Sequence, residues 1–149
     1  LFLILENLQD PGNLGTMIRT GEGAGITGVI MNSQTVDIFN PKTIRATMGS
    51  IFRVPFVYVP DLAPVLEQMH AKGIHTYAAH LKGQKYYDSF SFREPTAFLI
   101  GNEGNGLSQE ISDQAGQYLK IPMEGRVESL NASIAAALLM YEAHRQRSL

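Results

Sequence analysis

The most chemically distinctive stretch of the chain is residues 98–108, FLIGNEGNGLS, where three glycines and two asparagines surround Glu103. An apolar run comes first, so the loop is expected to begin where a buried strand ends. Its glycines follow the order G-x-x-G-x-G, the reverse of the dinucleotide fingerprint, and the Lys-Ser/Thr pair of a P-loop is absent. A carboxylate at this turn would also repel a pyrophosphate. The loop is therefore a poor phosphate cradle.

The exposed backbone amides and carbonyls of such a loop suit a planar, hydrogen-bonding group, and the acid suits a positive charge beside it. The adenosine and sulfonium of S-adenosylmethionine have this character, although glycine-rich loops between a strand and a helix also occur for plain steric reasons. A closer formal match to G-x-G-x-x-G lies at residues 23–28, GAGITG. There a predicted helix precedes the glycines and a predicted strand follows them, so they are expected to end the helix and allow close packing.

For four further polar side chains, either a role in chemistry or an ordinary structural role in a helix is a reasonable interpretation. Asn13 follows a Pro-Gly turn before a predicted helix and is expected to be its N-cap. Ser129 is the predicted N-cap of the last helix, with Asn131 in its first turn. Arg19 lies in the middle of a helix, where a lone arginine is usually solvated. The core face of that helix is predicted to comprise Leu14, Ile18 and Gly21.

The histidines and the absence of cysteine argue against a metal site. His70, His75, His80 and His144 lack the spacing of metal ligands, and the chain has no cysteine. His75 and His80, five apart on a predicted strand, would point to opposite faces of it. Neither a bound metal nor a disulfide is expected.

The bulk composition predicts a single domain over residues 1–149. With 149 residues, 44% of them hydrophobic, the chain can close one sizeable core but is short for two. No apolar stretch reaches the length of a membrane span and no basic-then-apolar leader opens the chain, so a cytoplasmic location without membrane contact is expected. The formal charge of −2 means that any affinity for nucleic acid must be local. Because the chain opens inside a predicted strand without an initiator Met, an N-terminal substrate-binding segment is expected to be missing.

Apolar runs that alternate with helical patterns predict an α/β fold with a mostly parallel, six-stranded sheet and helices on both faces. The predicted strands span residues 1–8, 28–32, 54–59, 74–81, 96–102 and 118–123. The predicted helices span residues 14–25, 41–52, 62–72, 108–114 and 129–146. Ligands on such sheets lie beyond the carboxyl ends of the strands. The segments at those ends are NLQDPGN, MNSQ, IGNEGNG and MEGRVES, which are mostly rich in turn and hydrogen-bonding residues.

Three blocks of the sequence resemble the motifs of a known family. They are NLQDPGNLGTMIRTGEGAG at 7–25, FLIGNEGNGLS at 98–108 and IPMEGRVESLNASIAAALLMYE at 121–142. In order and spacing they resemble the three motifs of the SpoU (TrmH-like) branch of the SPOUT RNA methyltransferases. The resemblance implies a deep trefoil knot at the C-terminal end of the sheet and a homodimer that joins two active sites. It also implies transfer of a methyl group from S-adenosylmethionine to a ribose 2′-hydroxyl of RNA, with S-adenosylhomocysteine as the product.

The resemblance assigns roles to the polar side chains named above. Asn13 would support the active-site turn, and Arg19 would bring the 2′-hydroxyl to reactivity. Because a guanidinium rarely gives up its proton, Arg19 is expected to orient the ribose and an adjacent phosphate. Glu103 would shape the pocket by hydrogen bonding. Ser129 would contact the substrate phosphate or ribose, and Asn131 would hold the loop near the active-site arginine. The cofactor contacts carry over to Ala79, Gly101, Asn102, Ile121, Met123 and Leu130.

A catalytic domain for ribose 2′-O-methylation is the first interpretation, with ribosomal RNA favoured over transfer RNA as its substrate. A non-catalytic RNA-binding or assembly module with the same fold is the second, and binding of S-adenosylmethionine would separate the two. A base-methylating relative is disfavoured, because the S-L-N-x-S block resembles the ribose branch. The side chains expected to receive RNA phosphates are Arg19, Lys42, Arg45 and Arg126.

Overall fold

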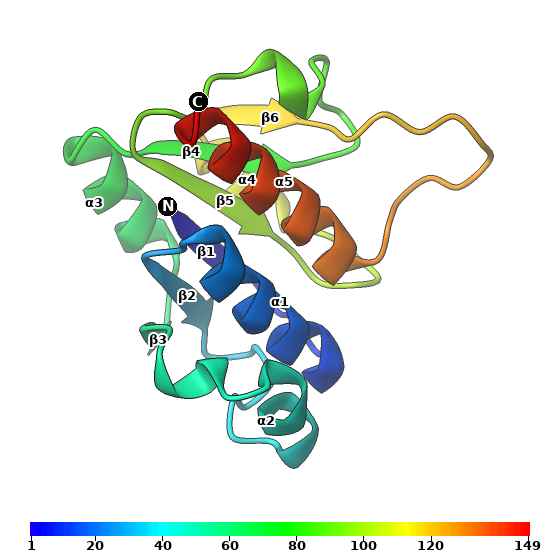
Figure 1. The fold of residues 1–149 in the computed structure, drawn as a ribbon. Helices are drawn as coiled ribbons and strands as arrows, with labels where there is room; N and C mark the ends of the chain where they lie inside the picture. The colour runs from blue at the N-terminus through cyan, green and yellow to red at the C-terminus, as the bar shows by residue number, and fades with distance from the viewer.

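Six parallel strands form one sheet in the computed structural model, which describes residues 1–149 (Figure 1). Their order is β3-β2-β1-β5-β4-β6. The strands are β1 (Phe2–Leu5), β2 (Gly28–Asn32), β3 (Phe56–Val59), β4 (His75–Ala79), β5 (Thr96–Ile100) and β6 (Gln117–Leu119). The helices are α1 (Pro11–Ala24), α2 (Pro41–Thr47), α3 (Ala63–Ala71), α4 (Gln109–Gln114) and α5 (Ala132–Arg147), with 3₁₀ turns η1 (Ser50–Phe52) and η2 (Tyr87–Ser89). The predicted α/β class and number of strands are confirmed.

The carboxyl ends of neighbouring strands lie level with one another. Leu5 at the end of β1 pairs with Met31 of β2 and with Ile100 of β5. Ala79 at the end of β4 pairs with Leu119 at the end of β6. The segments that follow these strands therefore leave the sheet along one side, the carboxyl edge, where parallel sheets bind their ligands.

Helices cover both faces of the sheet, because the central strands are apolar on both sides. Alternation along β1 sends Leu3 and Leu5 into the larger core and Ile4 into the smaller one. The larger core lies under α1 and α5, which run next to each other in Figure 1. The smaller core contains Leu66 of α3 and Ile111 of α4. The cores on the two faces hold the strand ends in place.

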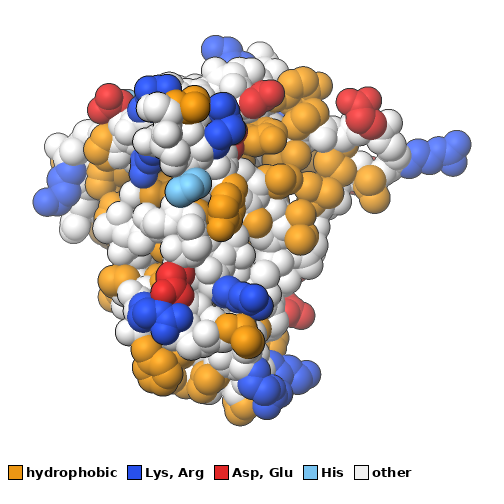
Figure 2. Space-filling view, in the orientation of Figure 1, with side chains coloured by type: hydrophobic (Ala, Val, Ile, Leu, Met, Phe, Trp, Pro, Cys, Tyr) orange, Lys and Arg blue, Asp and Glu red, His pale blue; other side chains and the backbone are white.

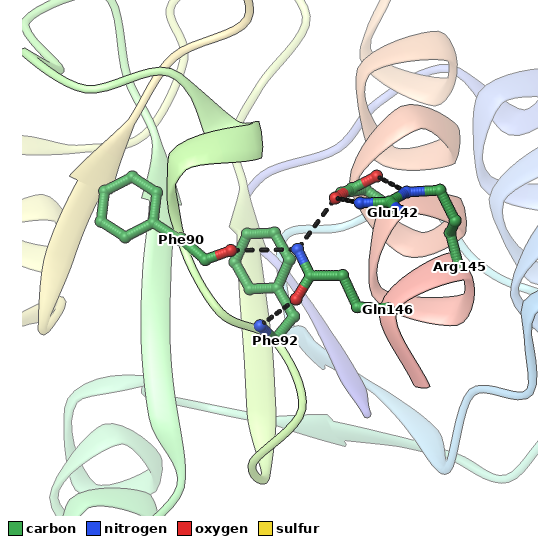
Figure 3. A network of polar contacts seen from close by, with 5 residues as sticks. All are labelled: Phe90, Phe92, Glu142, Arg145 and Gln146. Carbon is green, nitrogen blue, oxygen red and sulfur yellow. Dashed lines mark hydrogen bonds and ion pairs between the residues drawn. The ribbon is translucent and has the colours of Figure 1, made fainter. Parts of the chain in front are cut away.

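The last turn of α5 is hydrogen-bonded to the connection between β4 and β5 (Figure 3). The buried side chain of Gln146 accepts from the N–H of Phe92 at 2.6 Å and donates to the carbonyl of Phe90 at 3.0 Å. The same connection is joined to the residue after β6, since the N–H of Tyr87 donates to the carbonyl of Lys120 at 2.9 Å. These bonds hold three distant parts of the chain together, and the trefoil knot stays a prediction.

The N-cap predicted for the first helix is wrong. Asp10 caps α1, and its side chain accepts a hydrogen bond from the N–H of Asn13 at 2.8 Å. Asn13 thus lies in the first turn. The helix can begin at Pro11 because the first helical position needs no N–H donor and proline already has a helical φ. The aspartate just before it is then the better cap.

The N-cap predicted for the last helix is wrong as well. Asn131 is the N-cap of α5, and its side-chain oxygen accepts from the N–H groups of Ser133 and Ile134. Ser129 lies outside the helix, two residues before its cap. A short asparagine side chain that reaches two free amides is a strong cap, so the helix begins later than the sequence pattern suggested.

The helix predicted over residues 41–52 is divided in two. Met48 and Gly49 both have positive φ angles, 50° and 88°, so α2 ends and the chain resumes as η1. Left-handed residues end a helix because they turn its hydrogen-bonding direction. None of the helices is long and apolar enough to cross a membrane.

Candidate active site at the carboxyl edge

Glu103 ties the glycine-rich loop to the start of α1. Its carboxylate accepts from the N–H of Asp10 at 2.8 Å and from the N–H of Gln9 at 3.0 Å. The side-chain amide of Asn13 donates to it at 3.5 Å. All three donors precede Glu103 by at least 90 residues. One acid therefore holds the turn before α1 against the loop that follows β5.

Asn13 extends this contact to the last helix. Its side-chain oxygen accepts a hydrogen bond from the side-chain nitrogen of Asn131 at 3.1 Å. The side-chain oxygen of Asn131 is meanwhile engaged as the cap of α5. Because its oxygen is held by the helix, its amide group points at Asn13. The path Glu103–Asn13–Asn131 joins three segments that are far apart in the sequence.

Asn102 folds the glycine-rich loop onto itself. Its backbone exchanges hydrogen bonds with Gly106 at 3.1 and 2.8 Å, and its side-chain oxygen accepts from the N–H of Gly104 at 2.9 Å. Its side-chain nitrogen donates to the carbonyl of Asn7 at 2.8 Å. A Cβ on Gly101 would lie 2.1 Å from the carbonyl carbon of Gly106. The loop can close this tightly only with glycine at position 101.

Glu6 is a functional-site candidate that the sequence reasoning missed. Its buried carboxylate accepts from the backbone N–H and the hydroxyl of Ser108, both at 2.7 Å. Ser108 is also the N-cap of α4. The contact fastens the far end of the glycine-rich loop to the end of β1. An acid directly after the apolar run LFLIL was the available signal, because a carboxylate is buried only when it is hydrogen-bonded.

Asn32 was missed for the same reason. This buried residue at the end of β2 accepts from the N–H of Asn7 at 2.8 Å and donates to the side-chain oxygen of Asn7 at 2.7 Å. The hydroxyl of Thr35 also donates to it at 2.8 Å. Asn7 has a φ of 55°, a left-handed conformation that asparagine adopts more readily than most residues. These bonds set the path of the chain from β1 to α1.

Arg19 is not hydrogen-bonded to the other candidates. Its side chain is exposed on α1 and has no ion pair or hydrogen bond within the chain. It lies six residues after Asn13 on the same helix, which is about 9 Å along the axis. The guanidinium is therefore free to bind a ligand from outside.

The predicted cofactor-binding residues fall into two groups. Gly101 is buried at the end of β5, and half-buried Ala79 and Ile121 pack against the larger core. Met123 and Leu130 are half-buried on segment 121–130, which also carries exposed Ser129. Figure 1 shows this segment, in yellow to orange, projecting from the body of the protein. Its backbone makes no hydrogen bond with the rest of the chain, so its amides and carbonyls are available to a ligand.

His80 follows Ala79 and stacks on Tyr118, with ring centroids 4.6 Å apart. Burial, and secondarily the charge of Lys82, lowers the pKa of His80. Its Nδ1 accepts a hydrogen bond from the N–H of Lys82 at 3.0 Å. A neutral ring therefore stands beside the expected cofactor position. No group of three or more His, Asp or Glu side chains is placed to hold a metal ion.

Comparison with known proteins identifies relatives along nearly the whole chain. The model of the SpoU rRNA methylase family matches residues 1–141. The chain is 38% identical over 139 residues to the 23S rRNA (guanosine(2553)-2′-O)-methyltransferase RlmP of Bacillus subtilis, with 93% of this chain and 56% of the relative covered. The chain spans about half the length of the curated relatives that it matches.

Two solved structures illustrate the similarity of fold. The SpoU methyltransferase AviRb from Streptomyces viridochromogenes, in complex with AdoMet, superimposes with a TM-score of 0.93 at 35% identity, covering 99% of this chain and 58% of that one. A structure described as giving insights into 2-OH methylation of C/U34 on tRNA superimposes with a TM-score of 0.89 at 30% identity. There the coverage is 99% of this chain and 91% of that one.

Proposed function

Since the chain belongs to the SpoU rRNA methylase family, we propose that it transfers a methyl group from S-adenosylmethionine to a ribose 2′-hydroxyl of RNA. The family predicted from the three motif blocks is thereby confirmed. The observation that carries the proposal is the hydrogen-bonded path Glu103–Asn13–Asn131, which joins all three blocks at the carboxyl edge. Three side chains that match the motifs of the family therefore meet at the carboxyl edge, where parallel sheets bind their ligands.

The cofactor is expected to lie among the ends of β4 and β5 and segment 121–130. The adenine edge fits the unpaired backbone groups of that segment, and its faces fit the apolar side chains of Ile121, Met123 and Leu130. Ala79 and Gly101 offer close approach to the backbone, and Asn102 keeps the loop after Gly101 in place. When bound, the sulfonium supplies an electrophilic methyl carbon and leaves as the neutral thioether S-adenosylhomocysteine.

The chain's own contribution is to align the 2′-oxygen with the methyl carbon and to exclude water. Positioning of this kind supplies roughly 7 to 11 kcal/mol. Arg19 is exposed and unpaired, so it can hold the ribose and an adjacent phosphate in a bidentate contact. A methyl donor held there would lose its C–S bond as the new C–O bond forms, and the 2′-hydroxyl proton would pass to the phosphate held by Arg19, because a guanidinium does not accept it. Ser129, exposed on segment 121–130, is proposed to contact the phosphate or ribose of the target.

Glu103, Asn13 and Asn131 act as positioning residues in this scheme. They set the direction in which α1 leaves the carboxyl edge, and α1 carries Arg19. A shift at the start of a helix moves the whole helix, so the three residues control where the guanidinium meets the substrate.

A second copy of the chain is expected on α5, in a homodimer. The side chains of Ile134, Leu138 and Tyr141 are 50%, 37% and 48% exposed and line a shallow apolar hollow with Tyr87. Figure 2 shows hydrophobic side chains gathered over this helix. Exposed apolar patches of this kind usually mark interfaces. Sedimentation equilibrium measures the state directly.

Ribosomal RNA is the favoured substrate, because a relative that is 38% identical is a 23S rRNA 2′-O-methyltransferase. Transfer RNA is the second candidate. It is favoured by a single observation, that the structure connected with tRNA 2-OH methylation is 91% covered by this chain. The cytoplasmic location stays a prediction.

In the decisive experiment, the chain is incubated with isotope-labelled S-adenosylmethionine and total RNA. The 2′-O-methylated nucleotides are then mapped. Incorporation at a ribose supports the proposal and identifies the RNA. Calorimetry with S-adenosylmethionine separates it from the alternative of a non-catalytic RNA-binding module. Absence of cofactor binding, or methylation confined to a base, would refute the proposed reaction.

A further inference from the structure

The surface formed by α2 and η1 exposes large apolar side chains that the fold does not bury. Phe52 of η1 is 88% exposed, Met48 at the end of α2 is 68% exposed, and Phe39, which precedes α2 and packs edge-on against Phe56, is 62% exposed. Lys42 and Arg45 are exposed on α2. In the lower part of Figure 2, over α2 and η1, hydrophobic and basic side chains lie beside one another. These five residues are referred to below as the α2–η1 surface.

The backbone at Met48 gives a second reason to look outside the chain for a partner. Met48 is the C-cap of α2 and adopts a φ of 50°, in the left-handed region that favours glycine. The conformation is unfavourable for methionine, and its side chain is mostly in water, so the residue contributes little to folding. A large apolar side chain held at a strained and exposed position indicates a contact with another molecule.

The two cations of the surface have no acidic partner. The ion pairs in the structure join Arg53 to Glu22 and Arg145 to Glu142. The charges of Lys42 and Arg45 are therefore uncompensated within the chain. On a protein of formal charge −2, they form a local positive field beside exposed aromatic rings.

The α2–η1 surface is continuous with the candidate active site. A Cβ on Gly15 of α1 would lie 2.4 Å from the carbonyl oxygen of Thr43 and 2.5 Å from the Cβ of Ala46, so α2 crosses α1 at this point. Arg19 lies one helical turn beyond Gly15 and on the same side of α1. The surface therefore begins beside the arginine proposed to hold the reacting ribose. It leads away from the carboxyl edge, because η1 runs toward the amino end of β3.

We propose that the α2–η1 surface binds the single-stranded RNA that flanks the target nucleotide. Bases stack on Phe52 and Phe39 and contact the side chain of Met48, while Lys42 and Arg45 pair with phosphates. Single-stranded RNA fits both features of the surface, since every base has a π face and every nucleotide carries a negative charge. The inference rests on the proposed methylation of RNA and adds the route that the strand takes from the active site.

The first test separates a role in binding from a role in folding. Met48→Gly removes the left-handed strain, so it keeps or raises the melting temperature, and Phe52→Ala leaves it unchanged because the ring lies in water. Both variants weaken the binding of labelled oligouridylate and oligoadenylate. For Phe52→Ala the loss is about 5- to 150-fold, which corresponds to one stacked base. Leu149→Ala, which truncates another exposed apolar side chain (79%), is the matched control and retains full affinity.

The second test measures the contribution of the cations from the dependence of affinity on salt. A plot of log affinity against log salt has a negative slope. The double variant Lys42→Ala/Arg45→Ala reduces the magnitude of this slope by about 1.4, the value for two phosphate contacts on a single strand. The control Lys72→Ala/Arg93→Ala removes the same charge from exposed positions next to the amino ends of β4 and β5. The control leaves the slope unchanged.

The outcomes distinguish this surface from the proposed reaction. Unchanged RNA affinity in both Met48→Gly and Phe52→Ala overturns the inference, even if the chain methylates RNA. Loss of affinity that comes with a change of sedimentation coefficient also overturns it and assigns the surface to a second copy. Weakened RNA binding in a chain that transfers no methyl group supports the surface and refutes the proposed reaction instead.

Discussion

Replacing Glu103 by glutamine removes the charge that holds the turn before α1, and its consequences can be worked out from the structure. The carboxylate accepts from two backbone N–H groups, of Gln9 and Asp10, and from the side chain of Asn13. A glutamine of the same shape has one acceptor oxygen. Its NH₂ group must then face one of the amides that now donate. The 3.0 Å bond from Gln9 to Oε2 is lost when the NH₂ group takes that position, and the bonds to Oε1, from Asp10 at 2.8 Å and from Gln9 at 3.2 Å, are no longer charge-assisted.

The expected loss of stability is small and the expected loss of turnover is large. A hydrogen bond to a charged group is worth about 1.5 to 3 kcal/mol, and solvent around these exposed atoms reduces the cost to about 1 kcal/mol. For a chain of this size that corresponds to a melting temperature lower by about 2 to 4 °C. The start of α1 is then free to move by about an ångström, and a misplacement of that size can lower the rate by about 100-fold.

The assay is single-turnover methyl transfer to RNA, with calorimetric titration of S-adenosylmethionine and a thermal melt of the same preparation. Glu110→Gln is the matched control, because Glu110 is an exposed acid in the first turn of α4, close to the same loop. The control retains the rate. Glu103→Gln with an unchanged rate would refute the positioning role. A rate that falls only in proportion to cofactor affinity would place Glu103 in cofactor binding rather than in alignment of α1.

Three further outcomes follow from the same geometry. Gly101→Ala places a Cβ 2.1 Å from the backbone of the loop, so the free energy of unfolding in urea falls by about 1 to 3 kcal/mol and cofactor affinity falls with it; Gly125→Ala, which meets nothing within 4 Å, leaves the free energy of unfolding unchanged. Arg19→Lys abolishes most methyl transfer at an unchanged melting temperature, because lysine cannot make the bidentate contact, and full turnover in this variant would disprove that role. The hydrogen bond from Arg145 lowers the pKa of Glu142, burial opposes the shift, and Gln146 adds to it (Figure 3). The stability from this acid is therefore present above its ordinary pKa and is lost as pH falls through the lowered value. In an acid titration followed by circular dichroism, Glu142→Gln should lack this pH-dependent part of the stability. A titration profile identical to that of the unchanged chain would contradict the assignment.

The strands could be predicted from the sequence because their signal is local. All five residues of β5 are buried, and a strand covered on both faces must be an unbroken apolar run. Helix starts were less predictable. Asn13 and Ser129 both have good capping chemistry, yet Asp10 and Asn131 are the caps. The capping free energies of several candidate residues near one boundary differ by less than the free energy of packing the helix, so packing determines which residue becomes the cap.

The long-range contacts of the site had no local signal. Glu6 and Asn32 were not identified because a buried polar residue reveals its role only through its partners, here Ser108 and Asn7. Segment 121–130 was expected to contact the cofactor. Its projection away from the body of the protein could not be predicted from its own residues. The positive φ of Met48, which makes its exposed side chain unusual, could not be predicted from the sequence either.

The amino-acid sequence by itself determined the α/β class, the parallel sheet and the residue types available at each strand end, because burial and backbone preference act over a few neighbouring residues. Only the tertiary structure decided that Glu103, Asn13 and Asn131 share one hydrogen-bonded path across 90 and 118 residues of chain. It also decided that Arg19 stands free beside α2. Which side chains meet depends on how helices pack on the sheet, and that packing is a property of the whole chain.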